Sequence, residues 1–440
     1  MQSFDIQAFI DEQRMRPVHY AVLALCLVAM FIDGFDIFMV GKIAPAIAHA
    51  FGVSPAGMTL VFVLQQSGLA LGAFLISPLA DLLGRKRLLV ILSLLFGLLS
   101  ILTVFATSIA MLAIVRGISG IFLAGILPIA VALLSEFTPR RRRATFVAIG
   151  MTGYSLGNAA GASMALLVPD FGWQSAFWVG GIMPLLLVPI MMLSLPESLS
   201  FRVVRNPTDP AIARTIRRIA PDTVLSGDER FITGRSERAA VKTNPLDLFR
   251  DGRARASTIL FVACTLSMGT IALLAAWLPS FFQQMAGISI QRFAIAAMIG
   301  LLGGVAGMLT IGFLMDRIRP VRLLPAYFVG YGCALILLGR ISFGTPLFIP
   351  ALFTLAFFQG GGQAGLNMLM AQVYPTAIRS TGIGWAGGAG RIGGIILPLF
   401  GGYALHAFFS LQLTLALVAL APFLVAMLLL LMRPATPSGG

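Results

Sequence analysis

The chain has 440 residues, of which 58% are hydrophobic and only 11% are charged. Soluble domains are about 25% charged, so this composition excludes an ordinary soluble protein. A net charge of +14 would suggest nucleic-acid binding in a soluble protein, but in a membrane protein basic residues first determine topology.

Long apolar runs dominate the chain. A membrane-spanning helix needs about 20 mostly apolar residues. Twelve runs meet this requirement, near 18–46, 56–80, 87–106, 108–137, 144–168, 173–195, 257–284, 290–315, 321–341, 346–373, 380–405 and 408–432. We therefore predict an all-α polytopic membrane protein with twelve transmembrane helices.

One polar segment separates six runs from six. We predict an N-terminal six-helix bundle over 1–195, a cytoplasmic linker over 196–256 with a short amphipathic helix near 210–220, and a C-terminal six-helix bundle with a short cytoplasmic tail over 257–440.

The two halves repeat at an offset of 235–236 residues, which aligns Gly125 with Gly361, Gly157 with Gly393, and Asp81 with Asp316. Parallel repeats of this kind place a substrate site between two pseudo-symmetric bundles near the membrane midplane.

The basic residues are distributed unevenly between the loops. If the N-terminus is cytoplasmic, the loops on the other side contain only Lys42, Arg292 and Arg340, and two further arginines lie within runs. All other lysines and arginines fall on the cytoplasmic side, as the positive-inside rule requires. We expect a multi-pass protein of a bacterial inner membrane with both termini in the cytoplasm.

Two segments resemble a known family. The loop "PLADLLGRKRLL" resembles the best-known motif of the major facilitator superfamily, with Asp81, Gly84, Arg85 and Lys86 in its key positions. Leu82 departs from that motif, which has a basic residue there. The first run contains Asp-Gly-Phe-Asp at 33–36 and resembles the signature of the aromatic acid:proton symporters of this superfamily. The resemblance implies a twelve-helix transporter of benzoate, hydroxybenzoate or protocatechuate type.

Asp33 and Asp36 lie inside the first apolar run, three residues apart, so on a helix they share a face. An acid inside a membrane span is costly and by default marks a functional site. Two adjacent carboxylates titrate as a coupled pair. We assign proton coupling to both and leave open which one carries the proton. The alternative is that one acid only pairs with an arginine. Glu136 is a third candidate for proton coupling.

Arg116 and Arg391 are the two arginines that fall within runs. A guanidinium binds a carboxylate through two parallel hydrogen bonds, so both are candidates to bind an anionic substrate. Arg116 could equally be a structural partner of a first-run acid. Arg391 could equally form a salt bridge with an acid such as Asp36.

Polar and aromatic side chains elsewhere in the runs are candidates to complete a substrate site, because an aromatic ligand needs flat apolar faces and a few convergent polar groups. Together with Asp36 they are Tyr154, Asn158, Trp277, Gln363, Asn367 and Trp385. Each of them is also an ordinary packing residue in many membrane helices.

Charged residues cluster at the cytoplasmic ends of the runs. We interpret them as a latch of charge pairs between helices, which breaks and re-forms as the inner mouth opens and closes. Its members are Asp81, Arg85, Lys86, Arg143, Asp316, Arg317 and Arg379. The alternative is that they serve topology alone. The sequence Pro-Glu-Ser at 196–198 also occurs in sugar porters.

These expectations combine into one hypothesis. The chain is a proton-coupled importer of small aromatic carboxylates that works by alternating access, with no cofactor other than the proton as coupling ion. It needs no nucleic acid, no metal and no second copy. The alternatives are a transporter of a non-aromatic organic or sugar acid, a drug exporter, or a non-transporting membrane sensor. No phosphate-binding loop or catalytic cluster is present in the sequence, so we expect no enzyme.

Overall fold

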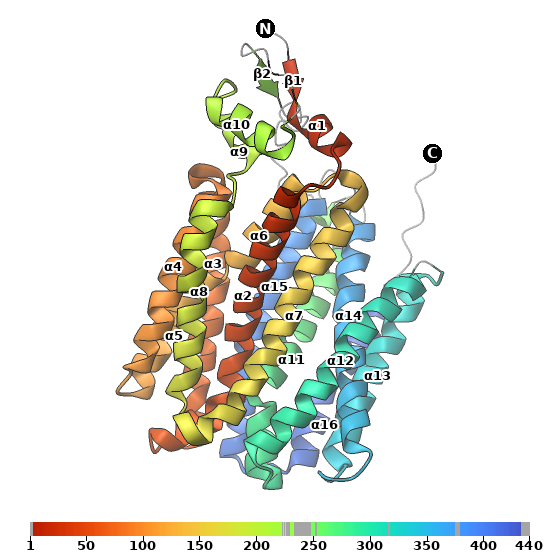
Figure 1. Cartoon of the computed structure of the whole chain (residues 1–440). Helices are drawn as coiled ribbons and strands as arrows, with labels where there is room; N and C mark the ends of the chain where they lie inside the picture. Colours follow the sequence, from red (N-terminus) through yellow and green to blue (C-terminus); the bar gives the residue numbers. More distant parts are fainter. Residues whose placement is uncertain are drawn as a thin grey trace. The chain divides into compact units, whose positions relative to one another are not determined.

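The computed structural model describes residues 3–221, 223, 225, 229–232, 248–250, 253–315, 317–374 and 379–432. The long helices are α2 Pro17–Ala50, α3 Thr59–Leu83, α4 Arg85–Val104, α5 Ile109–Leu123, α6 Ile126–Phe137, α7 Arg140–Phe171, α8 Gln174–Ser194, α11 Ala254–Ala286, α12 Ile290–Met315, α13 Pro320–Arg340, α14 Phe348–Val373, α15 Arg379–His406 and α16 Leu411–Leu430 (Figure 1). The short elements are β1 Ser3–Asp5, α1 Ile6–Glu12, η1 Pro55–Met58, α9 Leu199–Arg205, α10 Pro210–Ile219 and β2 Arg230–Ile232.

Each of the twelve predicted runs lies on a long helix or, for 108–137, on the consecutive helices α5 and α6. Among the described residues, ten helical stretches are long and apolar enough to cross a membrane. The other two predicted runs lie on α7 and α14, which are 32 and 26 residues long. The prediction of a polytopic helical membrane protein is confirmed, and the count of twelve spans is consistent with these helices.

Several helices begin or end at capping residues. The Ser108 side chain accepts a hydrogen bond from the Met111 N–H at the start of α5, and Ser410 does the same for Leu413 at the start of α16. Gly287 ends α11 with a φ of 68°, the left-handed conformation that glycine adopts without strain. The sequence thus provides local start and stop signals at these helix ends.

The chain divides into two compact units. Unit 1 comprises Met1–Met39, Ser67–Gly161 and Gln174–Val241, and unit 2 comprises Val40–Gln66, Ala162–Trp173 and Lys242–Gly440. The boundaries of these units therefore run through α2, α3 and α7. The domain boundaries predicted at 195 and 256 stay predictions.

Within unit 1, α4 packs against α8 and against α5. Glycines bring further helices together. An added side-chain carbon at Gly157 on α7 would collide with the Phe31 carbonyl on α2, and one at Gly68 on α3 would collide with the Gly117 carbonyl on α5. The first helix of this half therefore packs on the fifth, the second on the fourth, and the third on the sixth.

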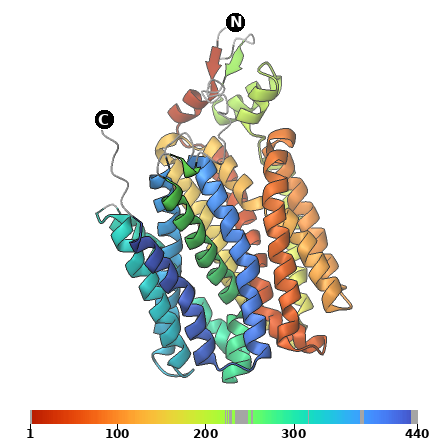
Figure 2. The same ribbon diagram turned by 180° about the vertical axis from the view of Figure 1, so that it is seen from behind.

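Unit 2 repeats the same pairing. Here α11 packs on α15, α12 on α14, and α13 on α16, and Figure 2 shows the green α11 beside the blue α15. Gly393, which the repeat aligns with Gly157, lies against the Thr265 carbonyl of α11, so the two aligned glycines make the same kind of helix contact. Small residues at such positions let helix backbones approach closely in membranes.

The amphipathic helix predicted near 210–220 is confirmed as α10. Its residues Ile212, Ile216 and Ile219 are buried in the same core as Ile6 and Ile10 of α1. The strand β1 also pairs in parallel with β2, an association of the N-terminal segment with the linker that the sequence did not predict. The first part of the linker therefore folds onto unit 1.

Asp209 forms the N-cap of α10 and accepts a hydrogen bond from the Ala211 N–H at 2.8 Å. Burial favours its protonated form, but the Ala211 N–H, the Arg202 side chain and the Arg214 charge outweigh burial and hold the pKa of Asp209 below its ordinary value. The carboxylate is therefore ionised at neutral pH, and it pairs with Arg202 at 2.9 Å.

The close approach of α15 to α11 predicts that Gly393→Ala destabilises the protein. Crowding of this kind costs about 1–3 kcal/mol, so we expect a thermal unfolding temperature several degrees lower in detergent. Gly387→Ala on the same helix is the control, because nothing lies within 4 Å of the added carbon and alanine favours a helix over glycine by about 1 kcal/mol. Equal effects of the two substitutions would contradict this packing.

Candidate functional site

Two carboxylates of unit 1 are buried on α2. Asp33 is 3% exposed and Asp36 is fully buried. Asp36 forms an ion pair with Arg116 of α5, and neither side chain has any exposed surface. The sequence left open whether Arg116 pairs with a first-run acid, and here it does so through Asp36.

Close packing of α2 brings this pair into the bundle. Gly34, between the two acids, lies against the backbone of Tyr154 on α7, where a larger residue would collide. The Tyr154 ring packs edge-on against Phe38 with ring centroids 5.7 Å apart. The Asp-Gly-Phe-Asp sequence therefore combines two acids with the small residue that lets a neighbouring helix approach.

The Arg116 guanidinium is only partly satisfied. Its carbon lies 5.5 Å from the centroid of the Phe177 ring, a favourable cation–π distance. Among the residues that the structure describes, its Nε and Nη1 atoms have no hydrogen-bond partner, and neither has Oδ1 of Asp36. Buried polar groups are normally paired, so these unused donors and this unused acceptor make Arg116 and Asp36 candidates to bind a ligand or a proton.

Two further buried polar atoms, one on α5 and one on α7, belong to the same part of unit 1 as judged by their helices. Within the described part of the chain, the Ser119 hydroxyl on α5 and Oδ1 of Asn158 on α7 lack a partner. Ser119 is three residues from Arg116 and Asn158 is four from Tyr154, so each shares a helix face with that neighbour. Asn158 and Tyr154 were predicted from the sequence. Ser119 was not, because a serine in an apolar helix gives no distinctive signal.

Unit 2 has its own chain of polar side chains. Ser267 of α11 is buried and donates to Oε1 of Gln363 on α14 at 2.8 Å, and Gln363 donates to Oδ1 of Asn367 at 3.3 Å. Gln359 donates to the buried Tyr331 hydroxyl at 2.9 Å. The predicted pair Gln363 and Asn367 is thus brought together, whereas Ser267 was missed. Arg391 is half-buried on α15.

The two candidate tryptophans differ in their surroundings. Trp277 has no exposed surface, donates its indole N–H to the Pro398 carbonyl at 2.8 Å, and packs edge-on with Phe62 at 4.9 Å. These contacts use its donor for packing against α15 and its ring for packing against Phe62 of α3. Trp385 is 52% exposed on α15, so its ring has surface to offer to a ligand or to lipid.

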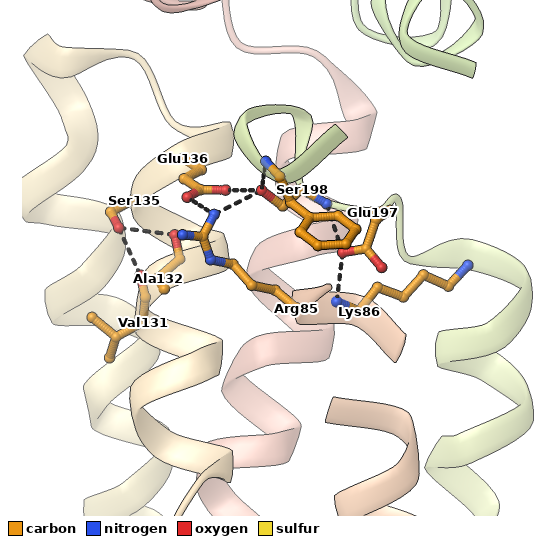
Figure 3. A network of polar contacts seen from close by, with 9 residues as sticks. Arg85, Lys86, Val131, Ala132, Ser135, Glu136, Glu197 and Ser198 are labelled. Carbon is orange, nitrogen blue, oxygen red and sulfur yellow. Dashed lines mark hydrogen bonds and ion pairs between the residues drawn. The ribbon is translucent and has the colours of Figure 1, made fainter. Parts of the chain in front are cut away.

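A charged cluster joins the start of α4, the end of α6 and the start of the linker (Figure 3). Arg85 forms an ion pair with Glu136 and donates to the Ser198 hydroxyl at 2.7 Å, and Ser198 in turn donates to Glu136. Glu197 accepts hydrogen bonds from the backbone N–H groups of Lys86 and Arg87. Glu136 therefore lies with the predicted latch residues.

Other predicted latch residues have different surroundings. Arg143 pairs with Asp11 of α1 at 3.2 Å, and the exposed Arg317 lies over the Phe313 ring at 4.2 Å. Asp316 and the side chains of Asp81 and Arg379 lie outside the described residues. Glu197, Ser198 and Asp11 were not predicted. For the first two, the signal was the Pro-Glu-Ser sequence.

No group of three histidine, cysteine, aspartate or glutamate side chains that could bind a metal occurs among the described residues.

The buried ion pair predicts a strong response to Asp36→Asn. Removing one partner of a buried pair costs about 3–5 kcal/mol, because the other charge stays buried and unpaired. We expect a large drop in the thermal unfolding temperature of Asp36→Asn, and partial recovery in the double variant Asp36→Asn/Arg116→Gln.

Arg143→Gln is the control, because its partly exposed pair with Asp11 contributes less than about 1 kcal/mol. A double variant that loses as much stability as the two single variants combined would contradict a direct interaction of Asp36 with Arg116.

Comparisons with known proteins agree with this architecture. The sequence matches the Major Facilitator Superfamily over residues 26–394 and 295–440. The chain is 32% identical over 428 residues to a gallate transporter of Pseudomonas putida, which covers 97% of this chain and 94% of that protein. It is also 32% identical over 400 residues to the 4-hydroxybenzoate transporter PcaK of Pseudomonas putida, covering 90% and 88% of the two chains.

A solved transporter structure has the same fold. The structure superimposes on an inward open structure of the xylose transporter XylE from E. coli with a TM-score of 0.74, at 15% sequence identity and over 96% of this chain and 97% of the other. The resemblance to aromatic acid transporters noted in the sequence is confirmed by the relatives, and the multi-pass helical fold by the solved structure. The chain is a member of the Major Facilitator Superfamily, a membrane transporter and not an enzyme.

Proposed function

We propose that this chain imports small aromatic carboxylates together with protons by alternating access. The observation that carries the proposal is the buried Asp36–Arg116 pair with unused hydrogen-bonding atoms, three residues from a second buried acid. The gallate and 4-hydroxybenzoate transporters that resemble this chain support the substrate class. The proton is the only coupling ion, no cofactor is needed, and one copy of the chain suffices.

In this mechanism, arginine recognises the substrate carboxylate. The two unused nitrogen atoms of Arg116 can donate to an anion without displacing Asp36. Arg391 on α15 has no acidic residue near it in sequence and is the second candidate. The amides of Gln363 and Asn367 are suited to ring hydroxyl groups, because an amide both donates and accepts hydrogen bonds.

We assign the proton to Asp33 and the arginine-holding role to Asp36. Arg116 already neutralises Asp36, whereas Asp33 lies on the same face of α2 and is almost completely buried. With the substrate anion and a proton both bound, the site carries no added charge. A neutral load lowers the cost of moving it through a low-dielectric barrier.

The number of protons determines the driving force. One monoanion moving with one proton carries no net charge, so only the pH gradient drives it, at about 1.4 kcal/mol per pH unit. A second proton would add the membrane potential, at about 2.3 kcal/mol per charge and 100 mV.

We place the chain in a bacterial inner membrane with both termini on the cytoplasmic side, because of the distribution of lysine and arginine between the loops.

The Arg85–Glu136–Ser198 cluster is assigned the latch role. Ion pairs that repack are a common basis of two-state elements, and this cluster ties α4, α6 and the linker together through three side chains. Breaking and re-forming it would let these helix ends move during the transport cycle.

Uptake into proteoliposomes tests the proposed function. With an acidic exterior, we expect accumulation of labelled 4-hydroxybenzoate, competed by gallate and benzoate but not by sugar acids or cationic dyes.

Asp33→Asn should abolish this accumulation and retain exchange of substrate down its gradient. Asp170→Asn is the control, because Asp170 is exposed near the end of α7. Full proton-driven accumulation by Asp33→Asn would overturn the coupling role.

The proposed carboxylate contact predicts a graded effect at Arg391. Arg391→Ala should weaken binding of 4-hydroxybenzoate more than Arg391→Lys, because lysine keeps the charge but loses the two parallel hydrogen bonds. A charge-assisted hydrogen bond contributes about 1.5–3 kcal/mol, which corresponds to roughly 10- to 150-fold in affinity. Titration calorimetry of the purified protein measures it, and unchanged affinity in both variants would remove Arg391 from the site.

A further inference from the structure

Two basic side chains, from the start of α4 and from α10 in the linker, meet at the end of α8. The Lys86 ammonium donates to the Met192 carbonyl at 2.7 Å, and the Arg218 guanidinium of α10 donates to the Ser194 carbonyl at 2.9 Å. Both cations are thus anchored on the last turn of α8. Together with Arg87 and Arg217, their exposed neighbours in the sequence, we call them the basic patch. In Figure 3 the Lys86 side chain extends away from the Arg85–Glu136 cluster.

The basic patch has an excess of positive charge. The two nearby acids are already engaged, because Glu197 accepts from the backbone N–H groups of residues 86 and 87, and Asp209 pairs with Arg202. Glu197 is also the acid whose charge acts on Lys86, and the positive charges of Arg218 and Arg202 oppose it there. In the part of the chain that the structure describes, the exposed guanidinium groups of Arg87 and Arg217 have no hydrogen-bond or ion-pair partner.

Exposed apolar side chains lie on the turn of α8 that anchors these cations. They are Met192 and Leu193, which are 58% and 83% exposed. The patch therefore combines a cationic part with an apolar part at the end of a membrane span. A phospholipid needs this combination, because its phosphate binds cations and its acyl chains contact apolar surface.

The helix α10 contributes its basic face and not its apolar face. An amphipathic basic helix in a linker would by sequence alone fit a helix that inserts its apolar side into the membrane surface. Here Ile212, Ile216 and Ile219 are buried in the protein core, so the apolar face is occupied. Arg217 and Arg218 remain exposed on the opposite side.

We propose that the basic patch binds the phosphate of an anionic phospholipid headgroup, with an acyl chain lying along Met192 and Leu193. The site is separate from the transport site and ties the folded linker to the membrane. A general positive-inside effect depends only on the number of charges in a loop. A headgroup site depends instead on which arginines are present, and this difference can be tested.

The test compares two triple variants with equal loss of charge. One is Arg87→Gln/Arg217→Gln/Arg218→Gln in the basic patch. The other is Arg140→Gln/Arg141→Gln/Arg142→Gln, three exposed arginines at the start of α7. Delipidated protein is titrated with phosphatidylglycerol, or with phosphatidylcholine of the same acyl chains, and bound lipid is counted by native mass spectrometry.

We expect wild type to prefer phosphatidylglycerol. A charge-assisted hydrogen bond to the phosphate contributes roughly tenfold or more in affinity, so the patch variant should lose on the order of 100-fold in phosphatidylglycerol affinity. The control variant should bind as wild type does, and uptake of 4-hydroxybenzoate by the patch variant should show that it is folded.

Three results would overturn the proposal. One is equal loss of lipid affinity in both triple variants, which would reduce the effect to general charge. Another is equal binding of the two lipids by wild type. The third is complete displacement of phosphatidylglycerol by millimolar inorganic phosphate, which would identify a free anion as the ligand of these arginines.

Discussion

A charge inside a membrane has to be neutralised by a partner, and the Asp36–Arg116 ion pair is where this chain meets that constraint. Neither side chain has any exposed surface. A buried pair contributes little net stability compared with apolar residues of the same volume, because both ions must be desolvated. Retaining such a pair, with hydrogen-bonding atoms left unused, is better explained by function than by stability.

The rest of unit 1 supports this pair. Gly34 lets α7 approach α2 beside the two acids, and Gly157 and Gly153 continue the same close contact along both helices. Gly68 and Gly72 do the same between α3 and the helix that carries Arg116. These contacts hold α2 against α7 and α5 against α3, so each helix that carries a member of the ion pair is itself fixed by close packing.

Local patterns in the sequence predicted the elements well and their partners poorly. Apolar run lengths located the helices, the amphipathic pattern located α10, and the repeat identified Gly157 and Gly393 as equivalent contacts. The spacing of Asp33 and Asp36 predicted one shared helix face. Each of these signals lies within a few residues of the feature it predicts, or follows from an internal repeat.

Contacts between distant residues could not be predicted in this way. Arg116 is 80 residues from Asp36, and its competing partners in the sequence were equally plausible. The pairing of β1 with β2 joins the N-terminus to the linker across more than two hundred residues. Ser267 and Ser198 were missed because a serine gains its role only from the side chains placed beside it, Gln363 in one case and Arg85 with Glu136 in the other.

Proton movement driven by substrate tests the central claim most directly. Proteoliposomes containing the wild-type protein and a pH-sensitive dye in the lumen receive external 4-hydroxybenzoate, with no initial pH gradient and no membrane potential. If the buried acids couple proton to substrate, the lumen acidifies as the substrate enters, beyond the change in protein-free liposomes. Substrate entry at full rate without acidification above that background would contradict the account.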